Sequence, residues 1–296
     1  MTKNSYFPYI LLLIQPAFMA SNLVVARGGV EYVPPISLAF WRWFLVFLIL
    51  LPFTYQTIFK NIKYLKKEYK KLFFLGAMGC GVCGAFPFMA GMTTTVANMG
   101  IIYTSSPIFI IFISSYFYRE HLNAVQFLGL GFCFAGVVSI IAKGDTSLLI
   151  SLKFNSGDLW MLGAAVGWAL YAVLLLNWKS KFSLFSRFTI IAFFGAVSLL
   201  PFSLIENYFI REVIFNNQFY FWTIFAAISP GIIAFSLYAQ VQKYLGASVT
   251  GFTLYLFTVY GAFYGIFIFS EQLKSYHYYG AILVLAGMFF VRKKNN

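Results

Sequence analysis

Long apolar runs separated by short polar connections make up almost the whole chain. Ten of these runs approach or exceed the roughly 20 helical residues that cross the hydrocarbon core of a bilayer. They cover residues 7–27, 35–58, 72–91, 97–118, 123–142, 157–177, 185–206, 219–241, 248–269 and 275–291. Backbone groups in lipid have to hydrogen-bond to one another, so each run is expected to be a helix. The pattern predicts an all-α integral membrane protein with ten transmembrane helices, the first of them a true span rather than a signal peptide.

The second half of this pattern repeats the first. Matched residues lie 151 positions apart, namely Glu120 and Glu271, Gly129 and Gly280, and Gly136 and Gly287. A period of half the chain is too long for a solenoid unit and is typical of transporters built from two structural halves. We expect one five-helix repeat in residues 1–145 and a second in residues 155–296, arranged around a central cavity.

Lysine and arginine are distributed unevenly over the connections. If the N-terminus is cytoplasmic, the cytoplasmic side holds 15 of them and the exterior holds five, with Arg42 left inside the membrane. This asymmetry predicts a protein of the cell (inner) membrane with both termini in the cytoplasm. Because five helices per half is an odd number, the second repeat is expected to be inverted relative to the first.

Composition supports the membrane class. Of the 296 residues, 61% are hydrophobic and 10% are charged, against about 25% charged residues in soluble domains. The formal net charge of +13 lies mainly in loops and at the C-terminus, where lipid headgroups account for it, so it does not indicate nucleic-acid binding. Cys80 and Cys83 form a C-x-x-C motif in an apolar run without further ligands, so we expect no metal and no cofactor.

Arg42 is the strongest candidate for chemistry inside the membrane. It lies about two turns into the second predicted helix, between Trp41 and Trp43. One interpretation is an anchor for a carboxylate or phosphate group of a substrate, since a guanidinium binds such groups through paired hydrogen bonds. The other is an arginine that extends to the outer headgroups beside interfacial tryptophans.

Amide and aromatic side chains on two helices suggest a pocket. Gln15 and Asn22 lie on one face of the first predicted helix, and Trp168 and Tyr171 share a face of the sixth. Aromatic rings with one or two amides suit a small polar or cationic organic molecule, although the same residues also serve helix packing. Further candidates for substrate binding are Phe86, Met89, Phe235, Tyr238 and Tyr255.

Two residues in matched places are candidate hinges. Pro107 in the fourth predicted helix and Thr258 in the ninth are 151 positions apart. A proline frees a backbone carbonyl and bends a helix, which fits a gating hinge or a static kink.

The acidic residues lie at helix ends rather than in mid-span. Glu120 and Glu271 are interpreted as structural carboxylates at helix starts, and Asp158 and Glu206 also lie at helix ends. Since proton coupling usually uses a buried carboxylate, this placement favours facilitated or exchange transport. The sequence has neither a P-loop nor a hydrolase or zinc-protease motif, so we expect no enzyme and no catalytic residues.

The pattern resembles the drug/metabolite transporter superfamily, in its EamA-type ten-helix branch. The residues that carry the resemblance are Ser21-Asn22-Leu23-Val24, Pro35, Phe40-Trp41-Arg42, Pro107, Glu120, Gly129, Gly136, Gly157-Asp158, Trp168-Ala169-Leu170-Tyr171, Gly246-Ala247-Ser248, Glu271, Gly280 and Gly287. The resemblance implies a cavity lined by helices one, three, four, six, eight and nine, and alternating access. This sequence departs from the family at Thr258, where a proline is usual.

We therefore expect a secondary (non-ATP) transporter of a small polar organic solute, an amino acid or related metabolite. The alternative is a carrier or exporter of hydrophobic or cationic compounds, of the drug or quaternary-amine type. The expected partners are a small-molecule substrate and the lipid bilayer, and the sequence leaves the oligomeric state open. A membrane enzyme or sensor would need a buried catalytic constellation or a soluble domain, and the chain offers neither.

Overall fold

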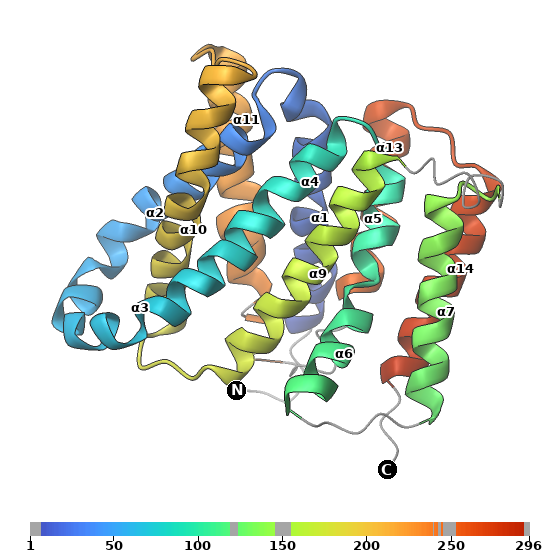
Figure 1. The fold of residues 1–296 in the computed structure, drawn as a ribbon, viewed down its shortest axis with the longest axis horizontal. Coiled ribbons are helices and arrows are strands. Elements are labelled where there is room, and N and C mark those ends of the chain that lie inside the picture. Colours follow the sequence, from blue (N-terminus) through green and yellow to red (C-terminus); the bar gives the residue numbers. More distant parts are fainter. Residues whose placement is uncertain are drawn as a thin grey trace.

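A computed structural model describes residues 7–118, 124–145, 155–238, 240–241, 244 and 253–292, and the regular elements within these ranges are all helical (Figure 1). The elements are α1 (Phe7–Gly28), η1 (Gly29–Glu31), α2 (Pro35–Lys60), α3 (Ile62–Gly76), η2 (Ala77–Val82), α4 (Cys83–Gly91), α5 (Val96–Thr104), α6 (Ser106–Tyr118), α7 (Ala124–Ile141), α9 (Ser156–Asn177), α10 (Leu184–Phe209), α11 (Asn217–Ala227), η3 (Ile228–Ile233), α13 (Thr253–Phe269) and α14 (Ser275–Arg292).

Seven helical stretches in the described residues are long and apolar enough to cross a membrane. They are Ile10–Glu31, Pro35–Lys60, Ile62–Gly91, Val96–Ser114, Ser156–Asn177, Leu184–Phe209 and Asn217–Tyr238. Phe127–Ile140 and Leu256–Phe269 are shorter apolar helices. The chain is thus a multi-pass, all-α membrane protein. Within the described residues, three of the ten expected spans do not meet this criterion: α7 and α13 have shorter apolar segments there, and α14 begins with polar and tyrosine side chains.

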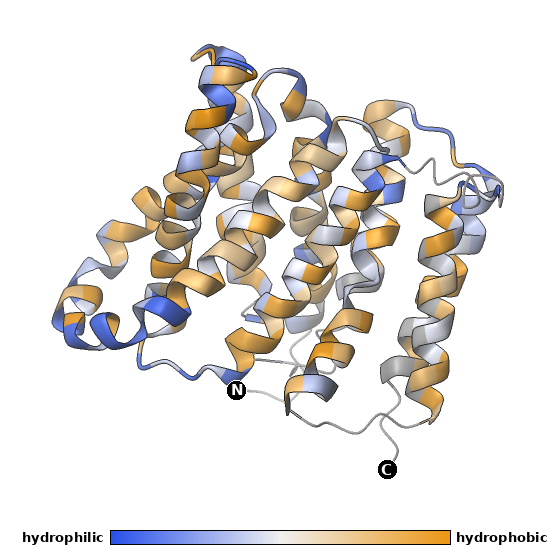
Figure 2. Cartoon of the chain, viewed as in Figure 1, coloured by the Kyte–Doolittle hydropathy of each residue, from blue (hydrophilic) through white to orange (hydrophobic). Residues whose placement is uncertain are grey.

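Hydropathy along the helices follows the expected membrane pattern. Figure 2 shows hydrophobic residues along the helix bodies and hydrophilic residues gathered near connections, such as the one between α2 and α3. Four helices are capped at their N-terminus by a side-chain oxygen that accepts from a backbone N–H group. The capping residues are Thr95, Asn155, Ser183 and Asn216. Such caps satisfy N–H groups that have no partner inside the helix, and they fix where α5, α9, α10 and α11 begin.

Helices α2 and α10 pack along one another in opposite directions. At one end, the carboxylate of Glu206 in α10 accepts from the backbone N–H groups of Ile36 and Ser37 at 3.1 and 2.7 Å. At the other end, Thr54 of α2 donates to the hydroxyl of Thr189 in α10 at 3.2 Å. A carboxylate at a helix N-terminus is favourable because the helix dipole is positive there. Glu206 therefore fixes the start of α2 against the end of α10.

Helices α7 and α14 form a second antiparallel pair. Gly136 lies so close to Gly280 that an added Cβ would stand 2.8 Å from the Gly280 carbonyl oxygen. Further along the same pair, the rings of Phe132 and Phe290 stack with centroids 5.8 Å apart. Small residues of this kind let two helix backbones approach closely in a membrane.

Two membrane-spanning helices contain a π-helical turn. In the first, η2 joins α3 to α4, and in the second, η3 follows α11 and continues to Tyr238. A π-turn holds one residue more per turn than an α-helix, so it rotates the residues that follow it and leaves backbone carbonyls free for other partners.

Candidate functional site

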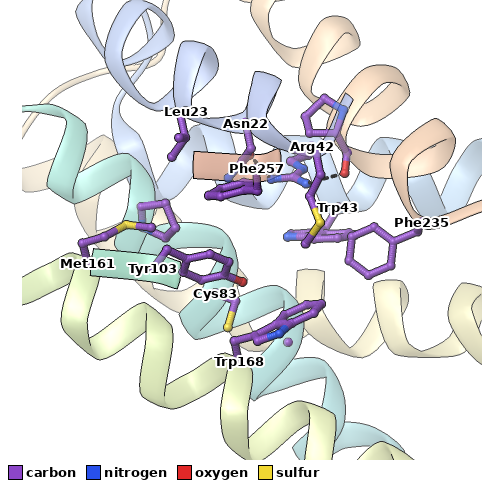
Figure 3. Close-up of a pocket in the computed structure, with 14 residues that line it drawn as sticks. Asn22, Leu23, Arg42, Trp43, Cys83, Tyr103, Met161, Trp168, Phe235 and Phe257 are labelled. Carbon is purple, nitrogen blue, oxygen red and sulfur yellow. Dashed lines mark hydrogen bonds between the residues drawn. The ribbon is translucent and has the colours of Figure 1, made fainter. Parts of the chain in front are cut away.

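A central cavity lies where α1, α2, α4, α5, α9 and α13 meet the two π-helical turns (Figure 3). Its lining residues are Met19, Asn22, Leu23, Arg42, Trp43, Gly79, Cys83, Pro87, Tyr103, Met161, Trp168, Pro230, Phe235 and Phe257. The free volume is about 40 Å³, enough for a few water molecules at most. The lining side chains therefore fill most of the site, and we call this arrangement the closed form.

The guanidinium of Arg42 is the charged group of this cavity and comes from α2. Its side chain is only 3% exposed. One terminal nitrogen donates to Asn22 Oδ1 at 2.6 Å, and the other donates to the carbonyl of Pro230 at 3.3 Å. The carbonyl of Pro230 lies within η3, where a π-turn leaves backbone acceptors free. The guanidinium also lies 4.5 Å from the ring centroid of Trp43, a cation–π contact.

Arg42 has no carboxylate partner among the described residues. Its partners are an amide oxygen and a backbone carbonyl, and its Nε is buried without an acceptor. A buried charge is normally paired with an opposite charge, because removing it from water is costly. Arg42 therefore keeps unused N–H donors, that of Nε among them, and a charge without a carboxylate partner. The interpretation as an arginine extending to the headgroups does not fit this inward position.

Aromatic rings form the wall of the cavity beyond Arg42. Trp168 lies 6.2 Å from Tyr103 and 6.3 Å from Phe235, measured between ring centroids. Tyr103 is in turn 5.5 Å from Phe257, and Phe235 meets the edge of Trp43 at 6.0 Å. Figure 3 shows these rings around the space below Arg42 and Asn22. The site thus has one cationic end and a largely apolar, aromatic remainder.

Four of the predicted substrate-binding residues line this cavity, namely Asn22, Arg42, Trp168 and Phe235. The structure places the others differently. Tyr171 lies behind the lining layer, with its ring 5.4 Å from Trp168. Gln15 is fully buried and donates to the carbonyl of Ala234 at 3.4 Å.

The remaining predicted residues do not reach the cavity or cannot be placed. Phe86 packs against Trp160 with ring centroids 4.8 Å apart, and Met89 and Tyr238 are partly buried outside the lining. The side chains of Tyr255 and Pro107 lie outside the described residues, although their backbones belong to α13 and α6.

Thr258, the second predicted hinge residue, contacts a neighbouring helix. Its hydroxyl shares a hydrogen bond with the hydroxyl of Thr104 in α5, and both side chains are buried. Thr104 also donates to the carbonyl of Gly100 at 2.8 Å. The position matched with Pro107 is therefore a polar crossing point between α13 and α5.

The lining also contains residues that sequence reasoning did not select. Trp43 and Tyr103 bring aromatic rings, Cys83 and Pro87 come from α4, and Met161 comes from α9. A signal for Trp43 was present, since it adjoins Arg42, the only charged residue of its apolar run. The others lie on helices that are apolar on every side, where periodicity does not distinguish a cavity face from a lipid face.

Comparison with known proteins agrees with this arrangement. The model of the EamA-like transporter family matches residues 6–142 and again residues 155–293. The uncharacterized transporter YyaM of Bacillus subtilis is 29% identical over 95% of this chain and 92% of its own length. An uncharacterized transporter of Archaeoglobus fulgidus is 25% identical over 97% of this chain and 98% of its own. A crystal structure with 15% identity superposes with a TM-score of 0.60 over 95% of this chain and 94% of that one, a likeness of fold.

Proposed function

This chain belongs to the EamA-like transporter family, and we propose that it is a secondary carrier of a small polar organic solute that bears a carboxylate, an amino acid or a related metabolite. The solute binds in the central cavity and crosses the cell membrane by alternating access. Both halves of the chain contribute lining residues to the cavity, so a relative movement of the halves would open it to one side at a time.

The observation that carries this proposal is the unpaired charge of Arg42. A guanidinium that is already buried, and held by Asn22 and Pro230 rather than by a carboxylate, is prepared to bind an anionic group without a large reorganisation. The rings of Trp168, Tyr103 and Phe235 provide the apolar surface for the rest of the molecule. A cationic drug would meet a like charge at Arg42, which disfavours the quaternary-amine alternative.

Contacts between matched helices support two inverted five-helix repeats in residues 1–145 and 155–296. The residues of α2 and α10 differ by about 151 positions, as do those of α7 and α14, and each pair runs antiparallel. A two-fold axis in the membrane plane would produce this relationship. With the N-terminus in the cytoplasm, the ends of α1 and α4 and the starts of α5 and α9 would face the exterior.

Uptake by reconstituted protein tests the proposal. The purified chain is first screened by thermal shift against amino acids and other metabolites, because a bound ligand raises the apparent stability by mass action. Proteoliposomes then take up the labelled compound that gives the largest shift. In Arg42→Gln we expect uptake to fall about tenfold or more, since one charge-assisted contact is worth about 1.5–3 kcal/mol. Asn22→Ala and Trp168→Ala are expected to reduce uptake as well.

Arg187→Gln is the matched control. Arg187 also donates to backbone carbonyls, those of Leu175 at 3.2 Å and Trp178 at 2.6 Å, but it lies outside the cavity lining. Its variant should transport normally once folded. Wild-type uptake by folded Arg42→Gln would refute the anionic anchor. Uptake of a quaternary amine that does not change in this variant would favour the alternative carrier.

A further inference from the structure

A second buried polar cluster joins the first half of the chain to the second, one helical turn from the cavity. Asp158 in α9 is 0% exposed. Its Oδ1 accepts from the hydroxyl of Thr94 and from Asn98 Nδ2, the latter at 3.1 Å. Met161, which lines the cavity, lies three residues after Asp158 and hence on the same face of α9. The cluster therefore links the start of α9 to the start of α5 beside the substrate site.

The cluster lacks one hydrogen-bond donor. Asp158 Oδ2 has no partner, and neither has Asn98 Oδ1, although Asn98 is only 2% exposed. Two buried acceptors without a donor are unusual, because nearly all buried polar atoms in proteins are satisfied. A carboxylate in this position would also hold a full negative charge away from water, which is costly. A proton on Asp158 Oδ2 would remove the negative charge of the carboxylate. It would also turn Oδ2 into the hydrogen-bond donor that the cluster lacks.

The small number of unpartnered oxygens favours a proton over a metal cation at Asp158. Among the described residues, Lys143, in the turn after α7, and Tyr276, in α14, interact electrostatically with Asp158. Glu271 acts on Tyr276 in turn. The positive charge of Lys143 stabilises an ionised Asp158, so it opposes a proton and a metal cation alike. Two unpartnered oxygens fall short of the six or so ligands that a hard cation requires.

We propose that Asp158 is a proton-binding site that links proton release and uptake to the opening and closing of this end of the carrier, with Asn98 and Thr94 as its partners across the two halves. This rests on the carrier function proposed above. When this end of the molecule opens, Asp158 separates from α5, meets water and releases its proton from Oδ2. When the end closes, the carboxylate takes a proton from the adjoining water before it is buried. Closure of this end of the molecule and proton uptake by Asp158 are thus thermodynamically linked.

This placement changes the expectation drawn from the position of Asp158 at a helix start. A carboxylate at the beginning of a helix is usually solvated, and that reading favoured facilitated or exchange transport. Here the α4–α5 connection and α5 cover the start of α9, with Asn155 Nδ2 donating to the carbonyl of Thr93 at 2.7 Å. The helix end is therefore buried by a different part of the chain.

Infrared difference spectroscopy of the full chain in proteoliposomes tests this without any solute. A carboxyl in water has given up its proton at pH 7, so a protonated carboxyl band at pH 7 reports a buried acid. We expect this band in the wild type, its loss in Asp158→Asn, and its retention in Asp145→Asn. The chain has only these two aspartates, and Asp145 is exposed. Labelling aspartate with a ¹³C carboxyl should therefore shift the band in unmodified protein, which covers the case in which Asp158→Asn does not fold.

Each outcome decides the proposal. A band that shifts with labelled aspartate and disappears with Asp158→Asn supports it. Absence of the band, or a band unaffected by aspartate labelling, overturns it. A band present in choline chloride and lost in sodium chloride also overturns it, in favour of a cation site. Because the spectroscopy uses no solute, its failure leaves the carrier proposal standing. Failed uptake with an intact band removes the carrier proposal and leaves Asp158 as a buried protonated acid that has no transport to regulate.

Discussion

Gly79 and Pro230 border the same cavity from positions 151 residues apart, and each lies in a six-residue π-helical turn. The turns, Ala77–Val82 and Ile228–Ile233, match at the same separation. At Pro230 the turn provides the carbonyl that accepts from Arg42. At Gly79 it brings backbone to the cavity surface without a side chain. Each half of the chain thus contributes one π-helical turn to the cavity.

Gly79 should tolerate no side chain. An added Cβ would lie 2.5 Å from a ring carbon of Tyr171, which is buried behind Trp168. We expect Gly79→Ala to destabilise the protein by about 1–3 kcal/mol, as overpacking of a filled core does, and to lower the thermal unfolding midpoint in detergent. In Gly81→Ala, in the same turn, the added Cβ would stand 2.9 Å from the rotatable hydroxyl of Ser198 and in ordinary contact with the Gly76 carbonyl at 3.8 Å. This variant should unfold near the wild-type temperature. Equal midpoints for the two variants would contradict this account.

Glu206 should contribute strongly to stability despite its place at a helix end. Its side chain is 4% exposed, and it accepts from two backbone N–H groups at the start of α2 and from the Ser37 hydroxyl. Loss of these bonds in Glu206→Ala is expected to cost on the order of 3 kcal/mol. Denaturant unfolding in mixed micelles would measure the loss. Glu212→Ala removes an exposed carboxylate nearby, and a similar loss there would argue against a specific role for Glu206.

The hydroxyls of Thr104 and Thr258 should be energetically coupled. They meet between α5 and α13, so Thr104→Val and Thr258→Val each break the same bond. Hydrogen bonds between transmembrane helices average about 0.6 kcal/mol. A double-mutant cycle on unfolding free energies should therefore give a coupling of about 0.5–1 kcal/mol. Additive single effects would show that the two helices are held together by other contacts at this level.

Signals that lie along the chain were sufficient for the all-helical membrane class and for four residues that line the cavity. Arg42 stands out because it is a lone charge in an apolar run, and the 151-residue offset is visible without any contact information. Asn22, Trp168 and Phe235 were found by helical spacing on their own helices. These are local patterns, and the cavity lining contains all four residues.

Cavity residues that follow a π-helical turn could not be predicted from the sequence in the same way. Phe86 and Met89 were selected on a regular helical face, but η2 precedes α4 and rotates that face. The cavity takes Cys83 and Pro87 from α4 instead. Because the segment is apolar throughout, hydrophobic periodicity carries no information about the π-turn.

Contacts between distant segments were equally inaccessible from sequence. Glu271 was interpreted as a structural carboxylate at a helix start, and the residues near it in the chain suggested α14. It accepts instead from the backbone N–H groups of Val96 and Ala97, about half the chain away. Its matched residue Glu120 lies outside the described residues. The predicted place at a helix start indicated that Glu271 is a structural carboxylate. Its partners depend on how the two halves pack, which its place in the chain does not reveal.

Glu271 should hold the end of the molecule at α5 closed. Its two oxygens accept from Val96 N at 2.8 Å and Ala97 N at 3.2 Å, which places a carboxylate at the dipole-positive start of α5. Like Asp158, it belongs to the second half and binds the first. Breaking these contacts in Glu271→Ala removes stabilisation from the closed form alone, so the population of open forms should rise.

The thiol of Cys83 provides a native reporter of that opening. It lines the cavity and donates to the carbonyl of Ala164 at 3.3 Å, so a maleimide reaches it only when the cavity opens. With Cys80 and Cys133 replaced by alanine, we expect Glu271→Ala to raise the labelling rate of Cys83 about tenfold, the equivalent of one charge-assisted hydrogen bond. Glu31→Ala, which removes an exposed carboxylate, is the control and should leave the rate unchanged. If folded Glu271→Ala labels no faster than this control, the contact with α5 supports the fold but does not gate the cavity.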